Sequence, residues 1–76
     1  YRIYPNPTSD QFSIQIDQVP PMGVWFELVN SIGQILIQQT IFESLSKFSL
    51  AKYDGNLFIV IFSVNSKIIT QKIIRK

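Results

Sequence analysis

Residues 57–64 have the sequence LFIVIFSV and residues 67–74 have the sequence KIITQKII, with Asn65-Ser66 between them. The first run is almost wholly apolar and rich in β-branched and aromatic residues, which favour strands over helices. Such a run is typical of a central strand that is buried on both faces. Asn65-Ser66 is predicted to be a two-residue hairpin loop, so the two runs are expected to pair as antiparallel neighbours.

Strand patterns continue from this hairpin toward the N-terminus. Apolar and polar residues alternate through 12–16 and again through 24–29, which predicts strands with one buried face. Further strands are predicted at 1–4, at 35–40 and, briefly, at 48–50, with 43–47 as a polar connection. Turn signals separate these segments: PNPTSD at 5–10, PPMG at 20–23, NSIG at 30–33 and DGN at 54–56.

The spacing of these segments predicts the fold class. Strands begin about every 10–13 residues, and no stretch of ten or more residues has a helical period. The sequence therefore predicts an all-β fold, a small immunoglobulin-like antiparallel β-sandwich of about 6–7 strands, with residues 1–76 as a single domain. The longest apolar run, Leu57–Phe62, is far shorter than the roughly 20 residues of a membrane helix.

Composition excludes most kinds of catalytic chemistry. The chain has 76 residues and neither cysteine nor histidine, which removes disulfides, thiolate nucleophiles, histidine bases and the commonest zinc ligands. The net charge of +2 is too small to indicate a class of partner. A chain of this size also buries only about 60–65% of its unfolded surface, so its stability margin is narrow.

Acidic residues are few and scattered along the sequence. Each lies in a separate segment, and no local pattern brings two carboxylates together as hydrolytic sites require. Asn6 and Asp10 carry oxygen ligands of the kind that calcium prefers, but two ligands are too few for a site. A turn that bonds its own backbone explains Asn-Pro-Thr-Ser-Asp as well. The sequence thus predicts no catalytic residue, no metal site and no cofactor.

Trp25 and a basic cluster are two candidate binding features. Trp25 lies on the face of its strand opposite Val24 and Phe26, where an exposed ring could stack on a sugar. A single tryptophan is, however, more often a core or interface residue. The bases at 67, 72, 75 and 76 could bind phosphates, but charges on an edge strand also prevent aggregation, and the aromatic pattern of RNA-binding sheets is missing.

Several short motifs follow one another in a characteristic order: YPNP at 4–7, FSI at 12–14, ELVNSIGQ at 27–34, FSL at 48–50, DGNLFIV at 54–60 and TQKII at 70–74. Together they resemble the type A C-terminal sorting domain of the type IX secretion system, the Por secretion tail, which is known from Bacteroidetes. The resemblance covers essentially the whole chain. It implies an immunoglobulin-like sandwich without catalysis of its own.

This resemblance also implies a function and a route. Such domains end cargo proteins that reach the periplasm, where the type IX machinery recognises the domain and moves the cargo across the outer membrane. A sortase-like peptidase usually removes the domain, and the cargo is released or attached at the cell surface. The expected partners are the outer-membrane translocon and this peptidase, with no nucleic acid. Because the chain begins with Tyr1 rather than Met, we expect it to be part of a longer secreted protein.

The family motifs map onto residues that we predict to act in recognition: Pro5, Asn6, Pro7, Gly33, Gly55, Phe58, Lys72 and Lys76. The Gly-x-Tyr motif of the family falls at Gly55-Asn56-Leu57 in this chain, so the aromatic residue, Phe58, comes one position later than in the family. Either Asn56 takes the glycine conformation, or one residue is inserted. Phe58 lacks the tyrosine hydroxyl, which matters if the family uses it for recognition and not if the ring is core. A lysine on an apolar terminal strand is less readily explained by the fold than the other motif residues, so Lys72 is the strongest candidate for a receptor contact.

Four further expectations remain open at this stage. The machinery is expected to recognise backbone and side chains of the last two strands, as in strand addition. An exposed edge strand could pair two copies, so a homodimer through an edge strand is a second expectation. The alternative function is an accessory carbohydrate-binding β-sandwich that uses Trp25 as a stacking platform. A third candidate function, after sorting and carbohydrate binding, is that of a plain structural spacer.

Overall fold

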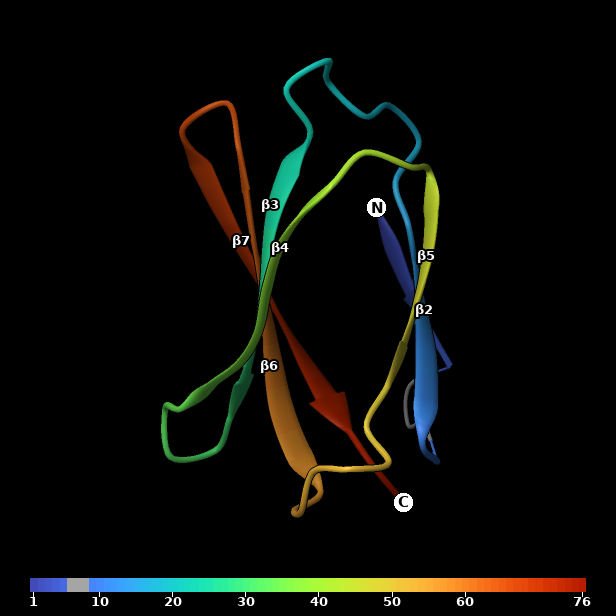
Figure 1. Ribbon diagram of the computed structural model, residues 1–76, viewed down its shortest axis with the longest axis vertical. Coiled ribbons are helices and arrows are strands. Elements are labelled where there is room, and N and C mark those ends of the chain that lie inside the picture. The colour runs from blue at the N-terminus through green and yellow to red at the C-terminus, as the bar shows by residue number, and fades with distance from the viewer. Residues whose placement is uncertain (6–8) are drawn as a thin grey trace.

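The computed structural model describes residues 1–5 and 9–76 (Figure 1). It contains the strands β1 (Arg2–Tyr4), β2 (Gln11–Gln15), β3 (Val24–Asn30), β4 (Ile35–Ile41), β5 (Leu45–Ser49), β6 (Leu57–Val64) and β7 (Lys67–Ile74). The described residues form no helix, so they include none that could span a membrane. The all-β prediction is confirmed.

Two antiparallel sheets pack face to face, as the two layers in Figure 1 show. The three-stranded sheet has the order β1-β2-β5, and the four-stranded sheet has the order β4-β3-β6-β7. Constant-type immunoglobulin sandwiches place the first, second, fifth and fourth strands in one sheet and the other three in the second. Here the fourth strand pairs with the third instead. The predicted immunoglobulin-like sandwich is therefore confirmed, with one strand exchanged between sheets.

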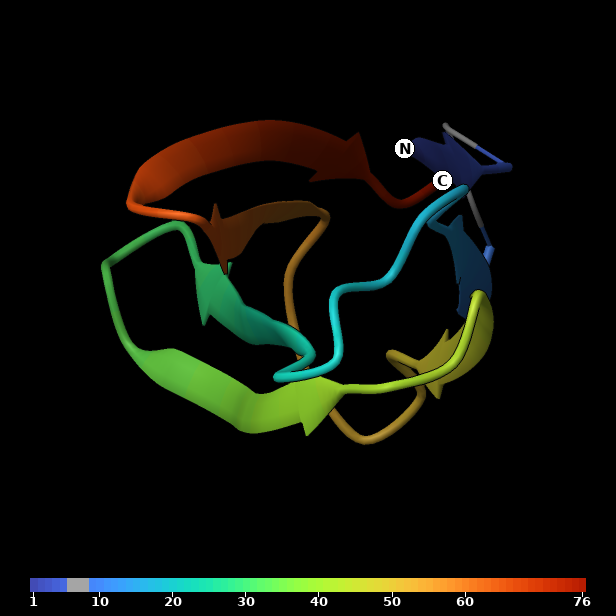
Figure 2. The same cartoon turned by 90° about the horizontal axis from the view of Figure 1, so that it is seen from above.

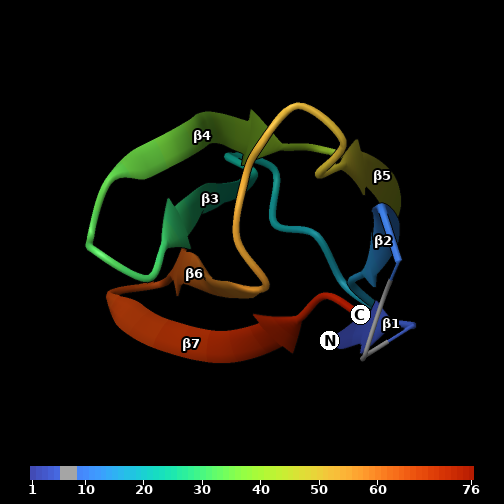
Figure 3. The same cartoon turned by 90° about the horizontal axis from the view of Figure 1, so that it is seen from below.

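The views along the long axis show how the sheets meet at their edges (Figures 2 and 3). On one side β4 continues directly into β5, and on the other side β7 lies next to the N-terminal segment. The Tyr1 hydroxyl and Gln71 Oε1 are 3.5 Å apart across this second junction. β7 thus remains an edge strand that pairs with β6 alone among the described strands.

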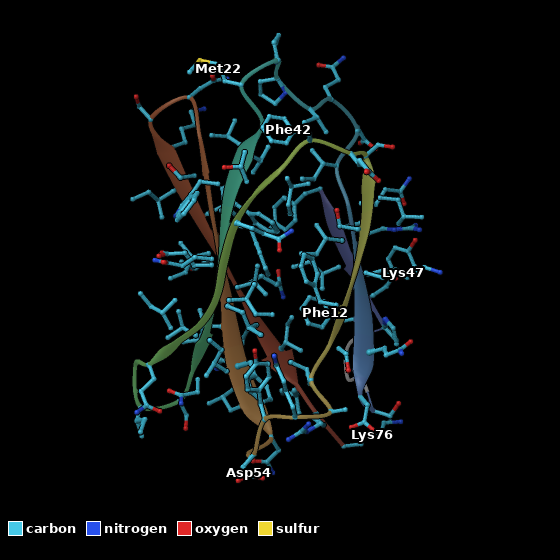
Figure 4. The ribbon with its side chains drawn as sticks, in the orientation of Figure 1. Phe12, Met22, Phe42, Lys47, Asp54 and Lys76 are labelled. Atoms are coloured by element: carbon cyan, nitrogen blue, oxygen red, sulfur yellow. The ribbon has the colours of Figure 1, made fainter. Side chains whose placement is uncertain are left out.

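The core lies between the sheets and consists of alternate side chains of the paired strands. Phe12 points into the space between the layers in Figure 4, and its ring stacks on Phe48, with the ring centres 5.6 Å apart. Phe48 also stacks on Phe26 across the layers, at 4.5 Å. The buried hydrophobic residues are Phe12, Ile14, Val24, Phe26, Leu28, Ile41, Leu50, Phe58, Val60, Phe62 and Ile73.

Turn residues set the register of the two hairpins in the larger sheet. Asn65 and Ser66 both have positive φ, 49° and 67°, which is the conformation of a type I′ hairpin turn. Their turn aligns Val64 with Lys67 and fixes the pairing of β6 with β7. In the other hairpin, the amide of Asn30 donates to the carbonyl of Gln34 at 3.0 Å. Both predicted loops are confirmed.

Two predictions about strands need correction. The strand expected at 48–50 begins earlier, because Leu45–Ser49 pairs residue by residue with β2, from Gln15↔Leu45 to Gln11↔Ser49. Backbone hydrogen bonds to a neighbouring strand here outweigh the polar composition of the segment. β6 is central as predicted, but it is fully buried on one face only. The side chains of its other face are half-buried.

Candidate recognition surface

Lys72, the strongest candidate from the sequence, lies on the outer surface of the four-stranded sheet. It is exposed, whereas the next residue, Ile73, is fully buried, so the two side chains leave β7 on opposite faces. Its partner across the strands is Ile59 of β6. Directly paired residues share a face of an antiparallel sheet, so Lys72 stands beside the outward side chains of β6.

We call the outward side of the four-stranded sheet the outer face. Its side chains are Trp25, Glu27 and Val29 of β3, Ile35, Gln38 and Thr40 of β4, Leu57, Ile59, Ile61 and Ser63 of β6, and Ile68, Thr70, Lys72 and Ile74 of β7. No described segment lies over this face in Figures 1 and 3. The solvated face of an antiparallel sheet is usually polar, but apolar side chains predominate on this one.

Several of these apolar side chains are strongly exposed. The exposed fraction is 73% for Ile68, 53% for Ile35, 49% for Ile74 and 40% for Trp25. Trp25 pairs with Thr40 on one side and Ser63 on the other, so hydroxyl groups flank its ring. The predicted outward position of Trp25 is confirmed, and the ring is accessible to a flat ligand or a protein partner.

Glu27 is the one carboxylate among the outer-face residues. Its Oε2 accepts a hydrogen bond from Gln38 Nε2 at 2.8 Å, and its partner across to β6 is Ile61. Glu27 and Lys72 therefore lie on opposite sides of β6, displaced by two residues along that strand. The outer face carries one charge of each sign within an apolar surround.

Gly33 and Gly55 both adopt left-handed backbone conformations in turns. Their φ angles are 89° and 100°, and a Cβ added to either residue would meet no atom within 4 Å. Their conformation, rather than a crowded contact, therefore explains glycine at both positions. The suggestion that Asn56 takes the glycine conformation is wrong, because the positive φ belongs to Gly55 itself.

Phe58 is part of the core. Its side chain is fully buried, and the Arg75 guanidinium lies 5.3 Å from the centre of its ring. A partner that binds the folded domain cannot contact this ring. Of the two readings of Phe58, the structure therefore favours the core role, in which the missing hydroxyl matters little.

The remaining predicted residues lie near the ends of the chain. Pro5 is exposed just after β1, whereas Asn6 and Pro7 lie outside the described residues. Lys76 is exposed at the end of the molecule opposite Met22 and Phe42 (Figure 4). Thus Pro5, Gly33, Gly55, Lys72 and Lys76 belong to separate surface regions, and the structure does not gather them into one site.

The candidate calcium ligand Asp10 has a different contact. Its Oδ1 lies 3.7 Å from Arg75 Nη1. Across residues 1–5 and 9–76, no group of three or more acidic side chains is placed to hold a metal ion. The second suggested ligand, Asn6, is outside that described part of the chain.

One open cavity of about 160 Å³ lies at the end of the sandwich near the N-terminus. Tyr1, Val24, Phe62 and Ile69 contribute to its apolar lining, together with Gln18. Of the described residues that line it, none is an acid, lysine or arginine. The cavity can accept a small apolar group.

Arg75 has a structural role that the sequence reasoning missed. Its guanidinium donates hydrogen bonds to the backbone carbonyls of Leu50, Tyr53 and Gly55 at 2.5–2.9 Å. Its own amide donates to the carbonyl of Asn56 at 2.8 Å. Arg75 therefore fastens the C-terminal end of the chain to the connection between β5 and β6. No local sequence signal marks this role, because its acceptors lie 20–25 residues away.

Comparison with known protein families identifies a match over nearly the whole chain. Residues 2–76 match the family model described as "Secretion system C-terminal sorting domain", Por_Secre_tail. No curated protein and no solved structure matches the chain. The match covers every described strand and all the residues of the outer face.

Proposed function

Because this chain belongs to the Por secretion tail family of C-terminal sorting domains for type IX secretion, we propose that it is the sorting domain of a longer exported protein. The family implies export across the cell envelope, to the surface or the medium. The domain labels its cargo in the periplasm and directs it through the outer membrane. It acts by being bound and carries out no reaction.

The proposed partners are the outer-membrane translocon and a sortase-like peptidase of the same system. The peptidase removes the domain after transit, at a site upstream of Tyr1. A binding role agrees with a composition that lacks histidine and cysteine, since the usual nucleophile–base pairs cannot be built. It also agrees with an apolar surface of the kind that proteins present to partners.

The observation that carries the proposal, beside the family match, is the position of Lys72. It is an exposed cation on the last strand, at the edge of a sheet and among apolar neighbours. A partner can add a strand at the edge of a sheet, while outward side chains supply specificity. We therefore propose that the machinery recognises the backbone edge of β7 together with Lys72. Pro5, Asn6, Pro7 and Lys76 remain secondary candidates.

A secretion assay tests this function. The 76-residue chain is fused behind an export signal, a fluorescent protein and a short linker. The fusion is expressed in a strain with a working type IX system and in a translocon-deficient strain. We expect fluorescence at the surface or in the medium only in the working strain. Periplasmic retention of a folded fusion in both strains would contradict the sorting role.

Point variants then separate recognition from folding. Deletion of residues 71–76 is unsuitable, because it removes buried Ile73 and the hydrogen bonds of Arg75. Lys72→Ala is expected to block secretion without unfolding the domain. Lys47→Ala is the matched control, because Lys47 is an exposed strand lysine on the other sheet that points away from the sandwich (Figure 4). Equal secretion of both variants would remove Lys72 from the recognised surface.

The alternative function is carbohydrate binding at Trp25. The ring is exposed and flanked by Thr40 and Ser63, and a hydroxyl-flanked aromatic ring is suited to stacking on a sugar. Polysaccharide pull-down with the intact chain and with Trp25→Ala tests it. Binding that disappears in the variant would favour this function, and the absence of binding by the intact chain would exclude it for the polysaccharides tested.

A further inference from the structure

The outer face has the apolar composition of a buried surface, but no described segment covers it. β6 is apolar on both sides, as in strands packed between two layers, yet only one of its faces is packed against the other sheet. Ile59 and Ile61 stand at the middle of the uncovered side, flanked by β3 and β7. Contiguous exposed apolar surface of this kind marks a site of association.

The two charges of the outer face lie on opposite sides of β6. Glu27 is paired with Ile61 on one side of β6, and Lys72 is paired with Ile59 on the other side. The midpoint between the two charged residues therefore falls on β6, between Ile59 and Ile61. A two-fold axis that lies in the plane of the face, passes through this point and is perpendicular to the line between the two residues exchanges the two positions.

We propose that two copies of this chain associate through their outer faces about such a two-fold axis. The isoleucines of β6 pack against their symmetry mates at the centre, and Trp25 and Ile68 widen the apolar contact. Each Lys72 then faces Glu27 of the second copy, which gives two equivalent ion pairs. An isologous interface requires such self-complementarity, and a face with one acid and one base on opposite sides of its centre provides it.

The size of the face limits the area that this association can bury. With the axis on β6, the strands β3, β6 and β7 overlap those of the second copy, and β4 lies outside the contact. Three strands about 4.8 Å apart, with seven or eight residues at about 3.3 Å each, cover roughly 350 Å² per copy. Two copies therefore bury roughly 700 Å² before the relief of the side chains is counted, which is the size of a weak, transient contact. We therefore expect a weak dimer that forms in a concentration-dependent way.

This mode of association does not rest on the proposed function, although both use Lys72, and it differs from pairing through an edge strand. Edge pairing would join backbone groups of β4 or β7 and would leave Glu27 and Lys72 without a common partner. Face-to-face packing leaves the sheet edges open and depends on side chains alone. Substitution of the two charges therefore distinguishes the two modes.

Sedimentation velocity of the full 76-residue chain over a range of concentrations tests the proposal. We expect a concentration-dependent dimer. Glu27→Lys and Lys72→Glu each place like charges together, and each is expected to weaken dimerisation about 100-fold. A mixture of the two variants restores opposite charges and is expected to form heterodimers of near wild-type affinity. Native mass spectrometry with one variant ¹⁵N-labelled identifies them.

Lys47→Glu is the matched control, because it makes the same charge change on the other sheet and should leave the dimer unchanged. Circular dichroism verifies that each variant is folded. Thr70→Arg is a second probe, because it places a large cation at an exposed position beside Ile61, and it should also give monomers. A wild-type chain that stays monomeric, a dimer that survives both charge reversals, or a mixture that forms no heterodimers would each overturn the proposal.

Discussion

The guanidinium of Arg75 lies over the ring of Phe58, with 5.3 Å between its central carbon and the ring centre. Phe58 is the first core residue of β6, and Arg75 directly follows β7. The same guanidinium is bonded to the carbonyls of Leu50, Tyr53 and Gly55. One side chain thus closes the end of the sandwich where the last strand finishes.

Arg75→Ala is expected to lower the free energy of unfolding by about 2–3 kcal/mol, because hydrogen bonds to charged groups contribute this much and the carbonyls lose their donor. A domain of this length has only about 4–11 kcal/mol in total. Urea unfolding followed by circular dichroism measures the loss. Arg75→Lys should recover only part of it, because an ammonium cannot reproduce the planar fork of donors.

Asp10→Asn is the control for the charge contribution of Arg75. Asp10 is exposed, and its carboxylate is 3.7 Å from the guanidinium, so the ion pair is expected to contribute less than about 1 kcal/mol. If Asp10→Asn were as destabilising as Arg75→Ala, the carbonyl contacts would not be the main source of stability.

The three glycines provide a graded test of backbone conformation. All have positive φ, so Gly33→Ala and Gly55→Ala are each expected to cost about 1 kcal/mol of stability. Gly23→Ala should cost more, about 2–3 kcal/mol, because its Cβ would lie 2.5 Å from Thr40 Cγ2 and 3.0 Å from the Ile41 carbonyl. Thermal unfolding of the three variants gives the order. Equal losses at all three positions would show that the contacts around Gly23 relax freely.

The β6–β7 turn offers a stabilising substitution. Ser66 has a φ of 67° at a position where glycine is preferred in two-residue hairpins. Ser66→Gly is therefore expected to raise the free energy of unfolding by about 0.5–1 kcal/mol. The same change at Ser63, which lies within β6, should be destabilising. A loss of stability in Ser66→Gly would mean that the hydroxyl makes a compensating contact.

The strands and turns of the sandwich could be predicted because the patterns that mark them are local in the sequence. Period-two alternation identified which side chains of β2 and β3 enter the core, and the turn residues at 30–33 and 65–66 marked both hairpins. The start of β5 was missed because its backbone pairing with β2 is a tertiary effect that composition does not encode. The contacts of Arg75 were missed for the same reason, since they join segments distant in sequence.

The candidate site was predictable only in part. The alternation of β7 places Lys72 opposite the buried Ile73, and motif resemblance singled out the lysine itself. The apolar run of β6 was interpreted as burial on both faces, because the sequence cannot show how many layers cover a sheet. In the structure only the three-stranded sheet covers β6, so the second apolar face of this strand is part of the protein surface.

Trp25 provides a direct optical probe of that surface, because it is the sole tryptophan of the chain and lies on the outer face. Its ring is 40% exposed, so its fluorescence in dilute solution should be readily quenched by iodide. Association through the outer face covers the ring, so quenching should fall and the emission should shift to shorter wavelength as protein concentration rises. Lys72→Glu should abolish this concentration dependence.

A bound polysaccharide would protect Trp25 equally at low protein concentration and in the Lys72→Glu variant, because stacking on the ring needs no second copy. Quenching that is the same at every concentration and with every polysaccharide would show that Trp25 is covered by neither.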